Sequence, residues 1–269
     1  MQPGIFAKTF PGRDPQTVLA AVRDAGFAAA QYNLACSGLP SMPEHVPEGT
    51  AAALVAAAGT TGVRLAALSG TGNMAHPDAA HRKAVVRQLR AVIGCAAQAG
   101  IPMVTLCTGT REAEDQWRFH PDNATPEAWA DMRATMAEAC DLAGAAGVLL
   151  GIEPEHANVV RTLDDALRLA QELRTDRLRI VLDPANLFEV GPAPDMARAV
   201  AAAAPLLGLV HAKDRGVDGR VMPPGDGAVD FPALFASLRA EGYRGAVITH
   251  GIDLPDVPQT ARRLRDWLA

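Results

Sequence analysis

The chain has few aromatic residues, since Phe, Trp and Tyr make up only 4% of its 269 residues. Hydrophobic residues nevertheless account for 49%, so a large core has to be built mainly from Ala, Val, Leu and Ile. Charged residues make up 20%, and they are scattered, with a net charge of −5 and no basic stripe. Because nucleic-acid backbones are bound by clustered cations, this distribution argues against DNA or RNA as a partner.

Other absences narrow the class of protein further. No apolar run reaches the roughly 18 residues that a membrane-spanning helix needs, and the first residues lack the apolar core of a signal peptide. The four cysteines (Cys36, Cys95, Cys107 and Cys140) form no CxxC pair, which is typical of reduced thiols in a cytoplasmic protein. No linker-like or low-complexity segment interrupts the chain. We therefore expect a cytoplasmic protein with a single domain over residues 1–269 and no membrane partner.

Short apolar runs alternate with longer amphipathic ones along the whole chain, a pattern typical of βαβ units around a parallel sheet. The eight expected strands are Gly4–Phe6, Ala28–Tyr32, Arg64–Leu68, Met103–Leu106, Val148–Ile152, Leu178–Leu182, Leu207–Val210 and Ala246–Thr249. Thr125, followed by proline, and Thr162 are expected helix N-caps. Eight units of about 34 residues predict a (β/α)8 TIM barrel. The alternative, a doubly wound open sheet, expects GxGxxG after the first strand, and residues 7–12 do not supply it.

The last four expected strands each end in an ionisable residue: Glu153, Asp183, His211 and His250. Barrel active sites lie where strands end, and consecutive strands are neighbours, so these side chains are expected on one arc of the rim. Isolated charges there are costly to bury and are usually paired or bound to metal. Two carboxylates and two imidazoles therefore predict a site for one divalent ion, with Mn, Co, Mg and Zn as candidates.

Each of these residues also has a simpler interpretation. A single acidic residue after a barrel strand is often a helix cap or an ion-pair partner. His250 fits equally well as a metal ligand, as a hydrogen-bond partner of a ligand residue or as an acid/base. The succession of four such residues on adjacent strands favours the metal site.

The run Glu153, Asp183 and His211 on successive strands resembles the xylose-isomerase-like superfamily. The phrases Ser69-Gly-Thr-Gly-Asn-Met-Ala-His-Pro77, Leu106-Cys-Thr-Gly-Thr-Arg111, Gly225-Asp-Gly227 with Asp230-Phe231, and Gly242-Tyr-Arg-Gly245 resemble its sugar phosphate isomerase/epimerase members. The resemblance covers nearly the whole chain. It implies a TIM barrel in which Glu153, Asp183 and His211 are metal ligands.

Two departures from the family pattern fall at the chemical centre. The family usually has a second glutamate at the end of strand eight, where this chain has His250. It often has Asp-x-x-His on strand six, with the histidine reaching the substrate, where this chain has Asp183-Pro-Ala-Asn186. In the keto-sugar epimerases of the family that this chain resembles, two glutamates face opposite sides of the substrate and exchange protons at carbon. With His250 in place of the second glutamate, this chain lacks that symmetric pair.

The predicted function is a metal-dependent isomerase or epimerase that acts on a sugar or sugar-like hydroxy-ketone, by proton transfer through an enediolate that the ion stabilises. Glu153 is the expected base and His250 the opposing acid/base. The alternatives are a metal-dependent dehydratase of a cyclic polyol and a non-catalytic metal- or sugar-binding barrel.

The expected partner is a small sugar-like molecule, and the oligomeric state, including a homo-oligomer, stays open. Lys213 shares strand parity with His211 and is expected to point inward, unless it pairs with Asp214. The full set of expected substrate contacts is Asn73, His76, Glu155, Asn186, Lys213 and Arg215. Arg111 is a further candidate for an anionic group, and the loop that contains Trp117, Arg118 and His120 is a candidate lid.

Overall fold

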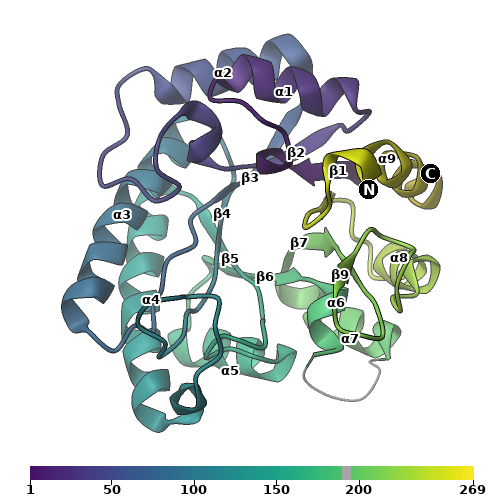
Figure 1. Cartoon of the computed structure of the whole chain (residues 1–269). Coiled ribbons are helices and arrows are strands. Elements are labelled where there is room, and N and C mark those ends of the chain that lie inside the picture. The colour runs from purple at the N-terminus through teal and green to yellow at the C-terminus, as the bar shows by residue number, and fades with distance from the viewer. Residues whose placement is uncertain (190–194) are drawn as a thin grey trace.

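The computed structural model describes residues 1–189 and 195–269, and its centre is a closed barrel of eight parallel strands (Figure 1). The barrel strands are β1 (Gln2–Phe6), β2 (Ala29–Tyr32), β3 (Arg64–Ser69), β4 (Met103–Leu106), β5 (Leu149–Ile152), β6 (Leu178–Leu182), β7 (Leu207–Ala212) and β10 (Ala246–Thr249). They follow one another in chain order, and β10 closes the barrel against β1. The predicted (β/α)8 barrel is confirmed.

The eight predicted strands all form, and their ends move by no more than two residues. The longest change that affects the site is in β7, which continues to Ala212 and so contains His211. A small antiparallel hairpin, β8 (Asp214–Arg215) with β9 (Val221–Met222), follows β7 and was not predicted. Asp214 is fully buried and accepts hydrogen bonds from four backbone amides of residues 215–229. Its carboxylate therefore holds this loop rather than pairing with Lys213.

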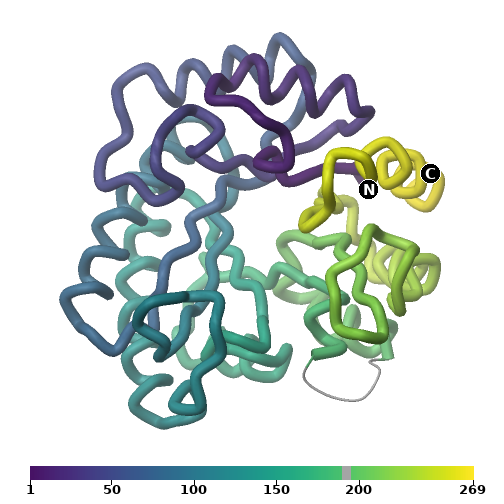
Figure 2. The backbone as a smooth tube through the Cα atoms, in the orientation of Figure 1, coloured from purple at the N-terminus to yellow at the C-terminus, as the bar shows by residue number. Residues whose placement is uncertain are grey.

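Helices surround the barrel (Figures 1 and 2). The α-helices are α1 (Pro15–Asp24), α2 (Thr50–Thr61), α3 (Ala79–Gln98), α4 (Pro126–Ala146), α5 (Leu163–Leu173), α6 (Pro184–Leu187), α7 (Met196–Ala203), α8 (Phe231–Ala240) and α9 (Val257–Leu268). The 3-10 helices are η1 (Ala7–Thr9), η2 (Leu34–Ser37), η3 (Pro121–Ala124), η4 (Ala204–Leu206) and η5 (Leu254–Asp256). In the described parts of the chain, no helix combines the length and the apolar character needed to cross a bilayer.

Local signals explain where several helices begin. Thr125 accepts a hydrogen bond from the backbone of Ala128 with Pro126 at the first helical position, as predicted for α4. Thr162 and Asp165 form a reciprocal capping box at the start of α5. The last helix, α9, contacts β1, so the two ends of the chain lie on the same side of the barrel (Figure 2).

The barrel strands are buried on both faces, as expected for a parallel sheet covered by helices. The main hydrophobic cluster contains helix residues and every other strand residue, such as Val247. A second cluster comes from the strands alone and fills the barrel: Ala29, Ala66, Ala67, Met103, Val181, Leu209, Ala246 and Ile248. Small residues make room for Met103, because a Cβ added at Gly151 would lie 2.8 Å from its sulfur. Because side chains alternate along each strand, the positions of these inner residues determine which side chains point inward at the rim.

Candidate metal centre and pocket

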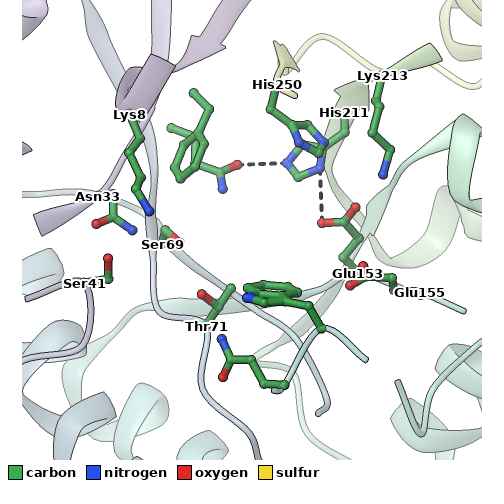
Figure 3. Close-up of a pocket in the computed structure, with 14 residues that line it drawn as sticks. Lys8, Asn33, Ser41, Ser69, Thr71, Glu153, Glu155, His211, Lys213 and His250 are labelled. Carbon is green, nitrogen blue, oxygen red and sulfur yellow. Dashed lines mark hydrogen bonds and ion pairs between the residues drawn. The ribbon is translucent and has the colours of Figure 1, made fainter. Parts of the chain in front are cut away.

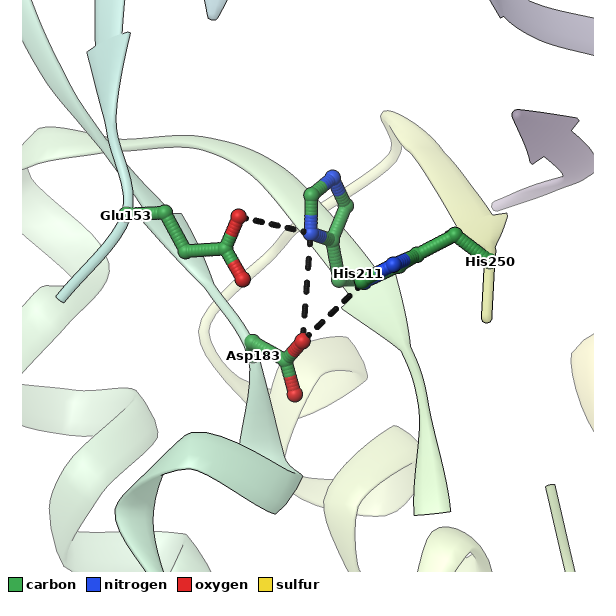
Figure 4. A group of neighbouring side chains, drawn as sticks. All are labelled: Glu153, Asp183, His211 and His250. Atoms are coloured by element: carbon green, nitrogen blue, oxygen red, sulfur yellow. Dashed lines mark hydrogen bonds and ion pairs between the residues drawn. The ribbon is translucent and has the colours of Figure 1, made fainter. Parts of the chain in front are cut away.

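Four side chains meet at the carboxyl ends of β5, β6, β7 and β10 (Figure 4). Each lies two residues after a strand residue that faces the barrel interior. Because side chains alternate along a strand, each of the four also points inward. The pairs are Gly151 and Glu153, Val181 and Asp183, Leu209 and His211, and Ile248 and His250. One ligand atom from each of the four ionisable residues lies within 4.8 Å of the others. The structure therefore brings the four predicted ligands together.

Asp183 lies at the centre of this group, and its side chain is fully buried. Its Oδ1 caps the short helix α6 by accepting a hydrogen bond from the backbone of Ala185 at 2.9 Å. Its Oδ2 lies 3.1 Å from both Lys213 Nζ and His250 Nε2. Burial alone would raise the pKa of this carboxyl group, but the Lys213 ammonium and the His250 contact outweigh it and hold the pKa well below its usual range. Asp183 is thus ionised throughout the neutral range.

His211 has a tautomer that its neighbours define. Gln31 on β2 donates through Nε2 to Thr105 Oγ1 at 3.2 Å, which leaves Gln31 Oε1 to accept from His211 Nε2 at 2.8 Å. The other ring nitrogen, Nδ1, then faces Glu153 Oε2 at 3.2 Å and Asp183 Oδ2 at 3.9 Å. This buried Nδ1 makes no hydrogen bond with any residue that the structure describes.

The Nδ1 atom of His211, which has no hydrogen-bond partner among the described residues, indicates whether the four residues suit a cation. A neutral imidazole whose Nε2 carries the proton presents a lone pair at Nδ1, and here that lone pair points at two carboxylates. Burial is the largest single effect and lowers the pKa of His211, but the charge and contact of Glu153 together with the charge of Asp183 outweigh it, so the net shift is upward. A positive charge at this point, either a proton or a metal ion, relieves the repulsion. The donor set and its geometry therefore fit a divalent ion.

His250 approaches the same carboxylate from β10. Its ring lies edge-on to that of His211, with centroids 4.5 Å apart. Burial lowers the pKa of His250, and the charge of His211 lowers it further, against the raising effect of Asp183. His250 is thus a mainly neutral imidazole beside Asp183. This position suits both of its predicted roles, as a metal ligand and as an acid/base.

Asn186 connects the candidate base to the neighbouring lysine. Its Nδ2 donates to Glu153 Oε1 at 2.8 Å, and its Oδ1 accepts from Lys213 Nζ at 2.5 Å. It is 2% exposed and does not line the pocket, so it positions Glu153 and Lys213 instead of facing a ligand. Lys213 does line the pocket and points inward as predicted, with Asp183 as its ion-pair partner.

A pocket of about 320 Å³ lies directly above this centre (Figure 3). Its lining residues are Phe6, Lys8, Gln31, Asn33, Ser41, Ser69, Thr71, Gln116, Trp117, Glu153, Glu155, His211, Lys213 and His250. Glu155 lies beside the centre, and burial, followed by the charge of Glu153, raises its pKa to about 7. The pocket therefore combines carboxylates, imidazoles, amides and hydroxyls around one opening.

Several predicted substrate contacts lie elsewhere. Asn73 is buried in the loop after β3, where its side chain bonds the backbone of Thr110 and Glu112. His76 stacks on His81 with centroids 3.9 Å apart. Neither Asn73 nor His76 lines the pocket, so the structure gives them a role in shaping loops.

The two arginines considered for an anionic group are also engaged away from the pocket lining. Arg215 forms an ion pair with Glu189. Arg111 pairs with Asp131 at 2.8 Å and donates to the carbonyl of Ala75. In the loop after β4, Trp117 lines the pocket together with Gln116, whereas Arg118 and His120 do not. Only part of the candidate lid therefore faces the site.

The lining residues from the first strands were not predicted, chiefly Lys8, Gln31, Asn33, Ser69 and Thr71. They follow the same parity rule as the predicted ones: Gln31 and Asn33 lie two and four residues beyond the inward-facing Ala29. Ser69 and Thr71 stand in the same relation to Ala67. Counting parity beyond the last four strands would have made Gln31, Asn33, Ser69 and Thr71 candidates, together with Asn73, which does not line the pocket.

Comparison with known proteins identifies a family that agrees with the observed barrel. A family model described as "Xylose isomerase-like TIM barrel" matches residues 19–269. The 3-dehydro-D-guloside 4-epimerase of Escherichia coli (strain K12) is 32% identical over 133 residues, which are 47% of this chain and 48% of that protein. The chain thus matches about half the length of this curated relative.

Solved structures share the fold over nearly their whole length. The apo form of 3-keto-D-glucoside 4-epimerase from E. coli superposes with a TM-score of 0.78 at 22% identity, covering 100% of this chain and 98% of that chain. A D-allulose 3-epimerase from Methylomonas sp. gives a TM-score of 0.77 at 19% identity, covering 100% and 98%. A D-psicose 3-epimerase solved in the presence of D-fructose gives 0.77 at 18% identity, covering 99% and 98%. At these identities the likeness establishes the barrel.

Proposed function

The chain belongs to the xylose isomerase-like TIM-barrel family, and we propose that it is a metal-dependent isomerase or epimerase of a sugar or sugar-like hydroxy-ketone. One observation carries the proposal: two carboxylates and two imidazoles converge at the base of a polar pocket, with the His211 Nδ1 lone pair directed at the carboxylates. The epimerase names of the relatives support the same reaction class.

Glu153, Asp183, His211 and His250 would hold one divalent ion. Mixed nitrogen and oxygen donors suit Mn, Co or Zn better than Mg, and four protein ligands leave room for substrate oxygens when the ion is five- or six-coordinate. When bound, the ion supplies Lewis-acid polarisation of a substrate carbonyl group. Gln31 holds His211 in the tautomer that directs Nδ1 to the site.

The protein groups then divide the proton transfer between them. Glu153 is the base that removes the proton from the carbon beside the carbonyl group, and Asn186 fixes its orientation through Oε1. The Lys213 ammonium stabilises the negative charge that develops on the substrate oxygen. If His250 is not bound to the ion, it would be the opposing acid/base: its imidazole would take up a proton from solvent and pass it to the substrate from the side away from Glu153. A carboxylate and an imidazole thus replace a symmetric pair of glutamates.

The pocket suits a polyol in size and in polarity. Its wall combines amide, hydroxyl and carboxylate groups that exchange hydrogen bonds with hydroxyl groups. Trp117 provides an aromatic face that is 52% exposed, against which the C–H face of a sugar packs. These features favour a sugar-like substrate over an apolar one.

The test is elemental analysis of protein supplied with Mn, Co, Mg or Zn, followed by a ketose panel in D2O monitored by NMR. We expect one bound ion per chain and exchange of the proton beside the carbonyl group. Glu153→Gln should lower turnover at least about 100-fold with an intact fold, whereas the exposed control Glu138→Gln on α4 should not.

Each alternative outcome of this test would assign a different function to the protein. Loss of water from the substrate would identify a dehydratase, and binding without exchange would identify a binding protein. Absence of metal under every loading condition would refute the proposal, as would near-full activity of the Glu153→Gln variant.

A further inference from the structure

The pocket has two chemically different walls (Figure 3). The metal centre, Glu155 and Lys213 come from the second half of the barrel. The opposite wall comes from the first half and consists of Lys8 in η1, Asn33 after β2, and the hydroxyl residues Ser41, Ser69 and Thr71. We call this second wall, defined by these five residues, the donor wall. The close-up shows it across the opening from His211 and His250.

The donor wall offers hydrogen-bond donors that the protein itself does not use. Asn33 Oδ1 accepts from the backbone of Ala35 at 2.9 Å, which leaves the Nδ2 of its buried side chain to face the pocket. Within residues 1–189 and 195–269, the side-chain hydroxyls of Ser41, Ser69 and Thr71 have no hydrogen-bond partner at normal distance. A ligand oxygen is the natural partner for such a group of donors.

Lys8 adds a positive charge to this wall. Among the described residues, no carboxylate lies within ion-pair distance of its ammonium group. The other lysine of the pocket, Lys213, is by contrast tied to Asp183. The chain uses arginine for most of its 25 basic residues and contains only three lysines, of which two line this pocket. An ammonium group can only donate hydrogen bonds, and it binds most strongly to an acceptor that carries negative charge.

We propose that the donor wall binds an anionic group, a carboxylate or a phosphate, at the end of the substrate far from the metal centre. The inference rests on the proposed function, because it assumes that the carbonyl end of a sugar-like substrate lies at Glu153 and His211. The other four donor-wall residues are neutral, and the carboxylates of the pocket, Glu153 and Glu155, lie on the other wall. Lys8 is exposed at the mouth of the pocket, and an anion bound there would gain a charge-assisted pair with it and accept from the neutral donors of the same wall, a gain that a neutral hydroxyl group does not have.

The test compares three ketoses that differ only at C6: D-fructose, D-fructuronate and D-fructose 6-phosphate. Their Kd values are measured by isothermal titration calorimetry on Mn-loaded protein, so the readout does not depend on turnover. We expect at least one anionic probe to bind about tenfold more tightly than D-fructose, the effect of one charge-assisted hydrogen bond. The probe that gains more identifies carboxylate or phosphate as the natural group.

Three variants assign the preference to the donor wall. Lys8→Gln should abolish it, and Lys8→Arg should retain most of it. Lys83→Gln, which removes an exposed lysine of α3 outside this pocket, should leave it unchanged. An anion that coordinates the metal ion directly would keep its preference in Lys8→Gln, because the four candidate ligands are intact there.

Equal binding of the three probes by the wild-type protein would overturn the inference, and so would a preference that survives Lys8→Gln. Either result leaves the proposed function standing if proton exchange is observed. If a Lys8-dependent preference is found without proton exchange on any ketose, the anion site is retained and the proposed activity fails.

Discussion

Gln31 offers the sharpest test of how the metal centre is built, because it hydrogen-bonds to one candidate ligand, His211, from a strand of the other half of the barrel. Its Oε1 accepts the His211 Nε2 proton at 2.8 Å, and both side chains are buried. Gln31→Leu keeps a similar volume but removes this acceptor. The His211 ring then loses the contact that fixes its tautomer, and a buried N–H group is left without a partner.

Loss of such an outer partner typically weakens metal binding by about 10- to 100-fold, or about 1.4 to 2.7 kcal/mol. We expect this rise in the Kd for Mn²⁺, measured by competition with a fluorescent chelator. Gln31→Glu is the matched control: it preserves an acceptor for His211, and the Thr105 hydroxyl donates to it in place of the present contact, so its Kd should not rise. A folded Gln31→Leu protein with wild-type affinity for metal would refute the assignment of His211 Nδ1 as a ligand.

Two further predictions concern pH and stability. Burial and the charge of Glu153 raise the pKa of Glu155 from 4.5 to about 7, so between these pH values the folded chain retains a proton that the unfolded chain releases. The metal-free protein should therefore lose stability as the pH rises from 4.5 to 7, and Glu155→Gln should remove that loss. The Tm difference between variant and wild type should therefore grow from pH 4.5 to 7, and a constant difference would contradict the pKa shift. Asp214→Ala removes the acceptor of four backbone amides and should lower the free energy of unfolding in urea by about 3 kcal/mol. The control Asp218→Ala, at an exposed position of the same loop, should leave the free energy of unfolding nearly unchanged.

The second half of the barrel was predictable because it concentrates ionisable residues at strand ends. Consecutive strands of a barrel are neighbours, so the order Glu153, Asp183, His211 and His250 along the chain becomes an arc in space. The boundaries of β5, β6 and β10 were predictable for a related reason, since each is a short, mainly apolar run that ends directly before an ionisable residue. What could not be predicted is the 3.1 Å contact between His250 Nε2 and Asp183 Oδ2, because it depends on how the two side chains turn at the rim of the barrel.

The first half was harder to interpret because its site residues are neutral or lie among many polar loop residues. Gln31, Ser69 and Thr71 are not ionisable, and only the parity of β2 and β3 distinguishes them from surface residues. Asn73 and His76 look similar in the sequence but are used by the protein itself, through contacts with the loop after β4. Whether a polar group faces a ligand depends on which backbone atoms its own loop leaves without partners, and the sequence alone does not contain that information.

This division of the barrel has a consequence for how its substrate range is set. The groups proposed for metal binding and proton transfer come from β5, β6, β7 and β10, whereas the donor wall comes from segments that follow β1, β2 and β3. Gln31, through its bond to His211, is a direct hydrogen-bonded link between the two halves at this site. Substitutions in the donor wall should therefore change which substrate binds without changing metal affinity, whereas substitution of Gln31 should change metal affinity first. Measuring both Kd values for Lys8→Gln and Gln31→Leu separates the two effects, and a shared loss of both in Lys8→Gln would show that the two walls are not independent.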